Sequence, residues 1–523
     1  MGTYLNVDTS SFESLRNTEY IDKSMLISYF NSCLDTTNRL LCVSRPRRFG
    51  KTSSIKMLAA YYNRDIDSHA LFNDLLIAKD KSYEMYINKY NTIFIDVSEF
   101  IVTAEQNENV VDNIQKKICA ELAANFPNVT NTQKLFDVMK EIRDITGNKF
   151  IVLIDEWDAI FRERSSEIEL QNQYIAMLRG LFKSSITDRV IAGAYLTGIL
   201  PIKKYGTQSA LNNFNEFTML NPEPLSEFIG FTEEEVQNLC LKHNVNFSEM
   251  QRWYDGYVFG NTHIYNPKSV LSALQRKLFE SYWTETETYL SLKKYIDMNF
   301  DGLKDSILIM VNGGRCEIKT RTFQNDMLNI KSRDDVLTLL VHLGYLAFDR
   351  VTKEVYIPNE EIFEEFKNAL DSKAWIVVQK ALEESELLLQ ATLAGNATKV
   401  AEIISREHLR SASVIRYNDE NALASVLSIA YYSAKKDYYI FRELPTGKGF
   451  ADLVFLPRND LTLPALIVEL KWDKSAQSAI KQIRDKQYTE ALADYAGKVL
   501  LVGINYDKVT KEHKCVIEQW NRN

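Results

Sequence analysis

The chain has 523 residues, of which 45% are hydrophobic and 25% are charged, and its formal net charge is -8. This length predicts three or four domains, and the composition is ordinary for a folded globular protein. An acidic chain is a poor candidate for a protein that coats nucleic acid, although a local basic channel is compatible with that charge.

The chain carries no sign of secretion or of membrane insertion. Its 6 cysteines are scattered, and no pair has the C-x-x-C spacing of a zinc or redox site. The N-terminal sequence MGTYLNVDTSSFE lacks the basic and apolar regions of a signal peptide, and Asn6 replaces the serine or threonine of a myristoylation motif. No apolar run approaches the roughly 18 residues of a membrane span. We therefore expect a soluble, cytoplasmic protein with free thiols and no membrane partner.

Short apolar segments alternate with helical segments over the first 230 residues. These segments are 40–44, 92–98, 150–156 and 190–198. Near-continuous apolar strands separated by helices are typical of a parallel sheet covered on both faces. We expect residues 1–230 to form one α/β domain.

The first of these segments leads into a loop, RPRRFGKTSS, which ends like a phosphate-binding loop but does not begin like one. The usual pattern is G-x-x-x-x-G-K-[ST], and Arg45 stands in place of its first glycine. Gly50 would supply the tight bend, Lys51 a cation for the phosphates and Thr52 a hydroxyl for Mg²⁺. The N-terminus of the following helix would add its dipole.

The loop therefore predicts a nucleotide site, and its arginines leave a question open. The expected nucleotide-binding residues of the loop are Arg47, Arg48, Phe49, Gly50, Lys51, Thr52 and Ser53. Together with Arg45, the arginines either bind phosphate or pair with acidic groups such as Asp158. In the second case they would leave the backbone amides to hold the phosphates.

The third apolar segment, FIVLIDE, ends in two acidic residues. Asp155 would hold Mg²⁺ through water, and Glu156 would be the catalytic residue that polarises the attacking water. Acidic helix caps are the alternative, but G-K-T on an earlier strand favours ATP binding. Thr197, in YLTG, is either a residue near the terminal phosphate or a plain strand-end threonine. Arg179 is either an arginine finger or, as we favour, a solvated surface residue.

The pattern changes from Phe231 onward. In FTEEEVQNLC, Thr232 is expected to cap a helix with Glu235 in the capping-box position. Residues 334–370 predict a helix, a hairpin and a helix, an order typical of winged-helix modules. Such modules bind DNA or serve only for packing, and packing is the favoured interpretation. We expect residues 231–375 to form a helical and winged-helix-like region.

Residues 376–523 predict a second α/β domain, with strands at 449–457, 463–472 and 498–507 and a helix at 475–494. Its candidate site starts from Glu469 and Lys471, which are two apart on one strand and therefore share a face. A charged pair on an otherwise apolar strand is costly without partners.

A hairpin would bring Asp452 beside Glu469, and two carboxylates form an oxygen-rich site for Mg²⁺ or Mn²⁺. Lys471 would orient or activate a water against a phosphodiester, so Asp452, Glu469 and Lys471 are the candidate catalytic residues. The alternative is a buried ion pair between edge strands. Gln482 and Tyr488 are polar residues of the following helix that would face the site. Glu420 is either a further metal ligand or a helix N-terminal charge.

Motifs along nearly the whole chain resemble a bacterial family that joins an AAA-ATPase-like domain to a PD-(D/E)XK nuclease-superfamily domain. The N-terminal motifs are YIDKSMLI, RPRRFGKTSS, IVLIDEWDAI, YLTGILPI, LNNFNEFT and RWYDGYVF, followed by YNPKSVL. The later motifs are HLGYLAF, VYIPNEEI, GFADLVF, LIVELKW and AIKQIRDKQY. RPRRFGK is the usual loop in that family, so Arg45 is no local defect, whereas Trp157 replaces a common tyrosine.

The resemblance implies a P-loop ATPase fold, a helical and winged middle region and a restriction-endonuclease-like terminus. It also implies ATP and Mg²⁺ as cofactors. Lys51 and Thr52 take the phosphate and magnesium roles, and Asp155 and Glu156 take the acidic roles. The nuclease roles fall to Asp452, Glu469 and Lys471.

Two functions remain open at this point. The first is an ATP- and Mg²⁺-dependent nuclease that cleaves nucleic acid, with DNA favoured, in defence or mobile-element biology. The second is an ATP-driven regulatory switch that binds nucleic acid or protein and uses the nuclease fold only for binding. The acidic net charge favours the second, and the intact carboxylate–lysine set favours the first. Homo-oligomerisation, sequence preference, and endonuclease or exonuclease action are left open.

Overall fold

The computed structural model describes residues 2–520 except 105–107, 132, 203, 206–207, 210, 284–291, 293–294, 297, 299, 301, 312, 321–322, 324–329, 370–372, 412–426, 428–430, 432, 435–436, 447–448, 459–461, 487, 489–494, 496, 509 and 511. The chain divides into two compact units. Unit 1 comprises Met1–Met310 and Cys316–Ala369, and unit 2 comprises Val311–Arg315 and Leu370–Asn523.

Unit 1 is built on a five-stranded sheet with the strand order β2-β3-β4-β1-β7, in which every pair is parallel. The strands are β1 (Leu40–Ser44), β2 (Asn91–Asp96), β3 (Phe150–Asp155), β4 (Ile191–Gly198) and β7 (Asn215–Phe217). All residues of β1, β3 and β4 are buried, as the apolar runs predicted. The predicted α/β class is therefore confirmed, and the sequence missed only β7, which is too short to show a pattern.

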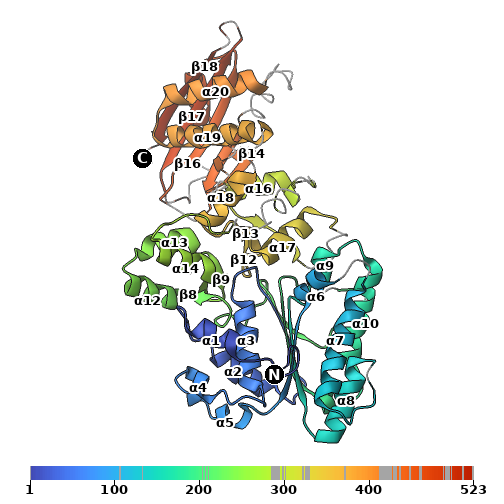
Figure 1. The fold of residues 1–523 in the computed structure, drawn as a ribbon. Helices are drawn as coiled ribbons and strands as arrows, with labels where there is room; N and C mark the ends of the chain where they lie inside the picture. The colour runs from blue at the N-terminus through green and yellow to red at the C-terminus, as the bar shows by residue number, and fades with distance from the viewer. Residues whose placement is uncertain are drawn as a thin grey trace. The chain divides into compact units, whose positions relative to one another are not determined.

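Helices cover both faces of this sheet (Figure 1). One face carries α1 (Ser10–Arg16), α2 (Met25–Cys33), α3 (Lys51–Tyr62), α4 (His69–Phe72), η1 (Leu76–Lys79) and α5 (Tyr83–Tyr86). The other carries α6 (Val97–Thr103), α7 (Val110–Asn125), α8 (Leu135–Thr146), α9 (Ala159–Glu163) and α10 (Ile168–Phe182). Three short elements complete this part, α11 (Thr187–Val190), β5 (Lys204–Tyr205) and β6 (Gln208–Ser209).

Residues 231–310 and 316–369 of unit 1, called the middle region below, are mainly helical with two small antiparallel sheets. Its first part contains β8 (Phe231–Thr232), α12 (Glu233–His243), α13 (Phe247–Tyr254), β9 (Tyr257–Phe259), β10 (Thr262–Tyr265) and α14 (Pro267–Arg276). Its second part contains α16 (Leu303–Val311), β11 (Cys316–Glu317), α17 (Arg333–Leu343), β12 (Ala347–Asp349), β13 (Glu354–Tyr356) and α18 (Glu360–Ala369).

Two predictions for the middle region are confirmed. Thr232 and Glu235 form the reciprocal hydrogen bonds of a capping box at the start of α12. The order of α17, the β12–β13 hairpin and α18 is the expected helix, hairpin and helix. Because the parallel sheet and the middle region lie in one compact unit, the division at residue 230 stays a prediction.

Unit 2 contains a mixed sheet with the order β14-β15-β16-β17-β18, in which only the β16–β17 pair is parallel. Its strands are β14 (Tyr438–Thr446), β15 (Gly449–Pro457), β16 (Ala465–Trp472), β17 (Val499–Asp507) and β18 (Glu512–Trp520). Its helices include α19 (Lys373–Leu393), α20 (Ala397–Ser411) and α22 (Ala476–Asp485).

The helices of unit 2 pack on opposite faces of its sheet. Leu388 of α19 and Ile404 of α20 share a core with even-numbered residues of β16, whereas Ile480 and Ile483 of α22 share one with odd-numbered residues. The three predicted strands are confirmed, and β14 and β18 were missed. The predicted helix 475–494 is not continuous, because α22 ends at Asp485 and Lys486 forms its C-cap. Residues 487 and 489–494 of the predicted range lie outside the described residues.

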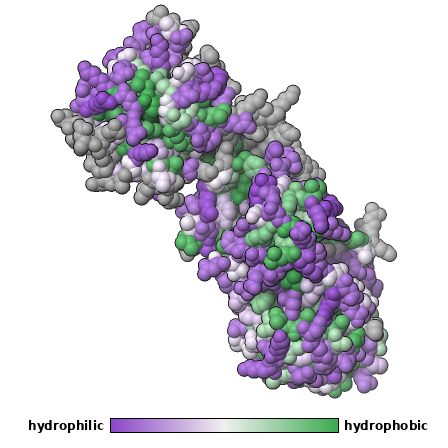
Figure 2. Space-filling view, turned by 90° about the vertical axis from the view of Figure 1, so that its left-hand side faces the viewer, coloured by the Kyte–Doolittle hydropathy of each residue, from purple (hydrophilic) through white to green (hydrophobic). Residues whose placement is uncertain are grey.

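Polar side chains dominate the surface seen in Figure 2, and apolar groups form separate patches between them. The most exposed apolar side chains include Val351, in the turn between β12 and β13, Val102 of α6 and Leu241 of α12. Among the residues that the structure describes, no helix has the length and apolar character needed to span a membrane.

Candidate nucleotide and metal sites

The glycine-lysine-threonine loop connects the buried strand β1 to the first turn of α3 in unit 1. Gly50 is the N-cap of α3 and has a φ of 92°, in the left-handed region where a side chain is disfavoured. A Cβ built at Gly50 would meet no atom within 4 Å, so the backbone conformation rather than crowding requires glycine here. The loop therefore has the bend and the open approach that a phosphate group needs.

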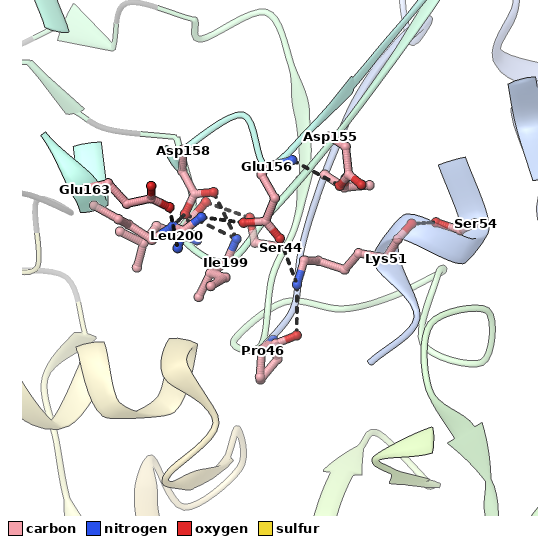
Figure 3. Close-up of polar contacts among 12 residues, drawn as sticks. Ser44, Pro46, Lys51, Ser54, Asp155, Glu156, Asp158, Glu163, Ile199 and Leu200 are labelled. Carbon is pink, nitrogen blue, oxygen red and sulfur yellow. Dashed lines mark hydrogen bonds and ion pairs between the residues drawn. The ribbon is translucent and has the colours of Figure 1, made fainter. Parts of the chain in front are cut away.

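Lys51 lies at one side of the polar network drawn in Figure 3, between Pro46 and Glu156. Its side chain is 4% exposed, and its Nζ donates to the Pro46 carbonyl at 3.0 Å and lies 3.8 Å from Oε1 of Glu156. Burial lowers the pKa of Lys51, and the nearby carboxylates of Glu156 and Asp155 oppose that effect. The amine thus lies between the loop and the acidic end of β3.

Asp155 and Thr197 are in contact because β4 lies directly beside β3. Thr197 is fully buried, and its hydroxyl donates to Oδ1 of Asp155. The amide of Trp157 also donates to the Thr197 carbonyl at 2.9 Å. The structure thus brings together three residues that the sequence placed on separate strand ends, Lys51, Asp155 and Thr197.

Arg162 of α9 links the two carboxylates that follow Asp155. Its Nη2 donates to Oε2 of Glu156, and its Nε donates to Oδ2 of Asp158 at 3.0 Å. Asp158 is fully buried and also accepts the backbone amides of Ile199 and Leu200 (Figure 3). Burial raises the pKa of Glu156, against the pull of the Lys51 and Arg162 charges.

Arg162, rather than a loop arginine, holds the Asp158 carboxylate. Arg48 nevertheless lies near another acidic group, Glu361, and its charge opposes the rise of the Glu361 pKa caused by burial. The two alternatives for the loop arginines, phosphate binding and pairing with acidic groups, therefore both stay open.

Arg45 is fully buried, donates to the Phe217 carbonyl at 3.0 Å and lies 5.1 Å from the Phe259 ring centroid. Burial lowers its pKa to about 10. Its guanidinium therefore anchors the start of the loop to β7 and β9.

Arg48 and Phe49 contact the middle region. Arg48 donates from Nη1 to the Tyr282 carbonyl at 2.9 Å. Phe49 is fully buried, with its ring centroid 5.4 Å from that of Tyr257. Their nucleotide-binding role remains a prediction, because these contacts direct them towards residues 257 and 282.

The other predicted residues of the ATPase site vary in exposure. Thr52 is exposed at the start of α3, and Arg47 and Ser53 are half-buried. Arg179 is exposed on α10. Its two alternatives, arginine finger and surface residue, both stay open.

A cavity of about 140 Å³ lies beside the loop and the start of α3. Most of its lining is apolar or aromatic. The lining includes Tyr20, Phe49, Met57, Phe228, Pro267 and Leu271. The cavity therefore joins the N-terminal segment, the loop and the middle region in one concave site.

The candidate metal site of unit 2 contains Asp452 on β15 and both Glu469 and Lys471 on β16. Oδ2 of Asp452 accepts the Leu470 amide at 2.7 Å, which holds its carboxyl group against the neighbouring strand. Lys471 Nζ donates to Oε1 of Glu469 at 3.1 Å. Glu469 is 1% exposed and Lys471 is 6% exposed. The predicted hairpin geometry is therefore present.

Glu469 has the properties of a cation ligand. Burial, followed by the charge of Asp452, raises the pKa of Glu469 to about 7. Its Oε2 is buried without a hydrogen-bond partner among the described residues. A buried carboxylate oxygen without a partner is costly, and a divalent cation beside Asp452 would satisfy it. The donor set thus fits the Mg²⁺ or Mn²⁺ that this fold class implies.

Gln482 and Tyr488 do face this site, as expected. Gln482 Nε2 donates to Oε1 of Glu469 and lies 3.2 Å from the Tyr488 hydroxyl. Glu420, the other predicted ligand, lies outside the described residues, so its role stays a prediction.

The functional residue that sequence reasoning missed in unit 1 is Arg162. Its spacing from Asp158, four residues along a short helix, was the available signal. The lining of the 140 Å³ cavity was also missed, because it assembles residues from segments far apart in the chain. Gly198 was missed as well: a Cβ there would lie 2.5 Å from Oδ1 of Asp158.

Comparison with known families identifies both parts. Residues 6–207 match the family described as predicted AAA-ATPase, and residues 418–520 match the PD-(D/E)XK nuclease superfamily. The two matches confirm the resemblance of this chain to an AAA-ATPase-like domain followed by a PD-(D/E)XK nuclease-superfamily domain. An uncharacterized protein in the vnfD 5′ region of Azotobacter chroococcum mcd 1 is 21% identical over 502 residues, covering 89% of each chain.

Two solved structures are also similar at low identity. The Aeropyrum pernix ORC2 protein, in ADPNP and ADP complexes, is 11% identical with a TM-score of 0.29, covering 69% of this chain and 93% of that chain. C. elegans PCH-2 is 14% identical with a TM-score of 0.24, covering 69% of this chain and 72% of that chain. Scores this low carry no argument, and the fold assignment rests on the strand order and the family matches.

Proposed function

We propose that this protein is an ATP-regulated nuclease that cleaves phosphodiester bonds in nucleic acid, with DNA favoured, using a divalent cation held by unit 2. The observation that carries the proposal is the buried Oε2 of Glu469, which has no partner among the described residues and lies in a carboxylate pair with Asp452. A fold used only for binding has no need to keep an unpaired carboxylate oxygen buried.

ATP binding is supported by the loop of unit 1. The phosphates of ATP would lie at the backbone amides of residues 50–52, where Lys51 would neutralise their charge. Thr52 and Asp155 would hold the Mg²⁺ ion. The adenine base would lie in the 140 Å³ cavity, whose aromatic and apolar lining suits a flat ring. Glu156 would orient the hydrolytic water once its carboxylate is released from Arg162.

Control by ATP is supported by the loop contacts with the middle region. Arg45, Arg48 and Phe49 contact Phe259, Tyr282 and Tyr257, respectively. A phosphate that reorganises the loop would therefore act directly on the middle region.

In unit 2, the bound cation would supply positive charge for a phosphate oxygen and lower the pKa of a bound water. Asp452 and Glu469 would hold it, and Gln482 would orient the Glu469 carboxylate. Lys471 lies 3.1 Å from Glu469, where its ammonium would orient a water or stabilise developing charge on the phosphate.

The test is cleavage of plasmid DNA and of single-stranded DNA with Mg²⁺, with and without ATP. We expect Lys471→Ala to lose cleavage by at least about 100-fold, as for other electrostatic catalytic groups. Lys481→Ala, a change to an exposed lysine of α22, should cleave like the wild type. Equal cleavage by Lys471→Ala and the wild type would refute the assigned site. In parallel, Lys51→Ala should abolish ATP binding, with Lys56→Ala on the same helix as the control.

A second candidate function is an ATP-driven switch in which unit 2 binds nucleic acid or protein without cleaving it. The formal net charge of -8 favours this candidate, because a nonspecific nuclease usually has a basic surface. Isothermal titration with Mn²⁺ separates the two. Binding that is lost in Glu469→Gln supports the nuclease, and no binding in the wild type supports the switch.

A further inference from the structure

Two large aromatic side chains are exposed on β14, an edge strand of the unit 2 sheet (Figure 1). Tyr439 is 51% exposed and Phe441 is 39% exposed. Residues two apart on a strand point to the same face, so the two rings are neighbours on one surface. Tyr438 lies on the opposite face and is buried with Phe455, so the exposure is confined to one side of β14.

The exposed side is the face that carries the metal site. Phe441 pairs with Val454 of β15, and Val454 pairs with Ile467 of β16. Val454 and Ile467 pack in the same core as Ile480 of α22. Glu469 is two residues beyond Ile467 and so points to the same face. From ordinary strand spacing, the Cα atoms of Phe441 and Glu469 are about 12 Å apart.

The α22 helix covers a different part of this face. It packs against β16, β17 and β18. The aromatic pair lies on β14, which is separated from β16 by β15 and is outside the strands against which α22 packs. Among the described residues, the two rings thus form an exposed strip beside the metal site.

A cation completes the strip. The guanidinium of Arg458, an exposed residue just after β15, lies 4.5 Å from the centroid of the Tyr439 ring. Its Nε donates to the Tyr438 carbonyl at 3.1 Å, which fixes its direction. Exposed aromatic faces next to a fixed arginine are the elements that proteins use to stack bases and to contact the phosphates between them.

We infer that Tyr439, Phe441 and Arg458 form a binding platform for single-stranded nucleic acid, on which successive bases stack while the strand leads to the metal site. This inference rests on the proposed function, because it names the substrate class of the same unit. The occupant is a nucleic acid strand rather than a protein because the strip combines flat rings with a cation and shares its face with a site suited to phosphodiester chemistry. Bases paired in a duplex do not offer their faces to such a platform.

The experiment is fluorescence anisotropy of the full-length protein with a labelled oligothymidylate, in EDTA and without ATP. We expect Tyr439→Ala and Phe441→Ala each to weaken binding by about 10-fold, the usual loss for one stacked base. Phe441→Tyr should bind like the wild type, whereas Phe441→Leu should bind like Phe441→Ala. The control is Leu387→Ala, which removes a 54% exposed side chain elsewhere in unit 2. We expect that change to leave affinity unaltered.

Three results would overturn the inference: no binding of the oligonucleotide by the wild type, unaltered affinity in both alanine variants, or equal loss in Phe441→Tyr and Phe441→Ala. Unaltered affinity in both alanine variants would show that the strip does not bind the strand. Because EDTA prevents metal-dependent cleavage, these results are independent of the cleavage test. If the variants do not fold, photocrosslinking of a bromouracil strand to the wild type decides the matter. Crosslinks should map to residues 438–441, and their absence there would refute the platform.

Discussion

The guanidinium of Arg48 donates a 2.9 Å hydrogen bond to the backbone carbonyl of Tyr282, which joins the phosphate-binding loop to the middle region. Arg48 has a φ of 69°, in the left-handed region that side chains avoid. The loop thus adopts a strained backbone at the residue that makes this contact. Such strain persists only where surrounding interactions hold it.

We predict that Arg48→Ala destabilises unit 1 by about 1–3 kcal/mol, because a charge-assisted hydrogen bond is lost and the backbone strain remains. Thermal unfolding of the full chain measures this change. Arg48→Gly relieves the strain but also loses the contact, so it separates the two effects. If the hydrogen bond matters, Arg48→Gly will still be less stable than the wild type. If Arg48→Gly is at least as stable as the wild type, the hydrogen bond from Arg48 to Tyr282 contributes little to stability, and backbone strain is the main effect of this residue.

We predict that Arg162→Met destabilises unit 1 by about 3–5 kcal/mol. The change leaves the fully buried Asp158 without its ion-pair partner. Chemical denaturation measures the loss. The matched control is Arg164→Met, which removes an exposed pair with Glu167 and should alter stability by less than about 1 kcal/mol. Similar effects of the two changes would contradict a structural role for the buried pair.

We predict that Gly198→Ala is destabilising by about 1–3 kcal/mol, because its Cβ would overlap Asp158 and lie 2.7 Å from Cδ1 of Trp157. Both neighbours are buried and cannot move aside easily. Gly180→Ala is the control, since a Cβ there meets nothing within 4 Å and alanine favours the helix α10. That variant should be as stable as the wild type or slightly more stable in thermal unfolding.

We predict a pH-dependent stability that depends on Glu361. Its carboxyl group accepts from the Ser269 hydroxyl and the Tyr282 amide, and burial raises its pKa to about 8. The folded state therefore binds a proton that the unfolded state releases above about pH 4.5. This group's contribution to stability is complete below that pH and is lost as pH rises to about 8.

Glu361→Gln removes this titration, so the melting temperature of the variant should fall less than that of the wild type between pH 5 and pH 8. Glu360→Gln, the same change at the preceding half-buried residue, should follow the wild-type profile. Parallel profiles for the wild type and Glu361→Gln would show that Glu361 does not control the pH dependence.

The sequence predicted the two groups of acidic and basic residues because simple geometry determines where they meet. The carboxyl ends of parallel strands share one edge of a sheet, so Lys51, Asp155 and Thr197 had to converge. In unit 2, the period of two along a strand placed Glu469 beside Lys471. Neither inference required knowledge of residues far away in the chain.

The directions of the loop arginines could not be predicted, because their partners come from distant segments. Arg45 reaches residues 217 and 259, and Arg48 reaches residue 282. No periodicity or spacing in the sequence encodes those contacts. Strands β14 and β18 were missed for a related reason: edge strands are only partly buried, and their apolar pattern is correspondingly weak.

The docking of Pro46 and Phe49 has a consequence for any shortened form of this protein. Gly344 approaches Pro46 so closely that a Cβ on the glycine would lie 2.8 Å from it, and the Tyr257 ring packs against that of Phe49 in an edge-to-face contact. Cutting the chain after residue 230 would remove Tyr257 and Gly344 and so expose the side chains of Pro46 and Phe49 in the loop before α3. The smallest soluble ATP-binding fragment should therefore extend to the end of α18, well past the boundary that the family match alone would indicate.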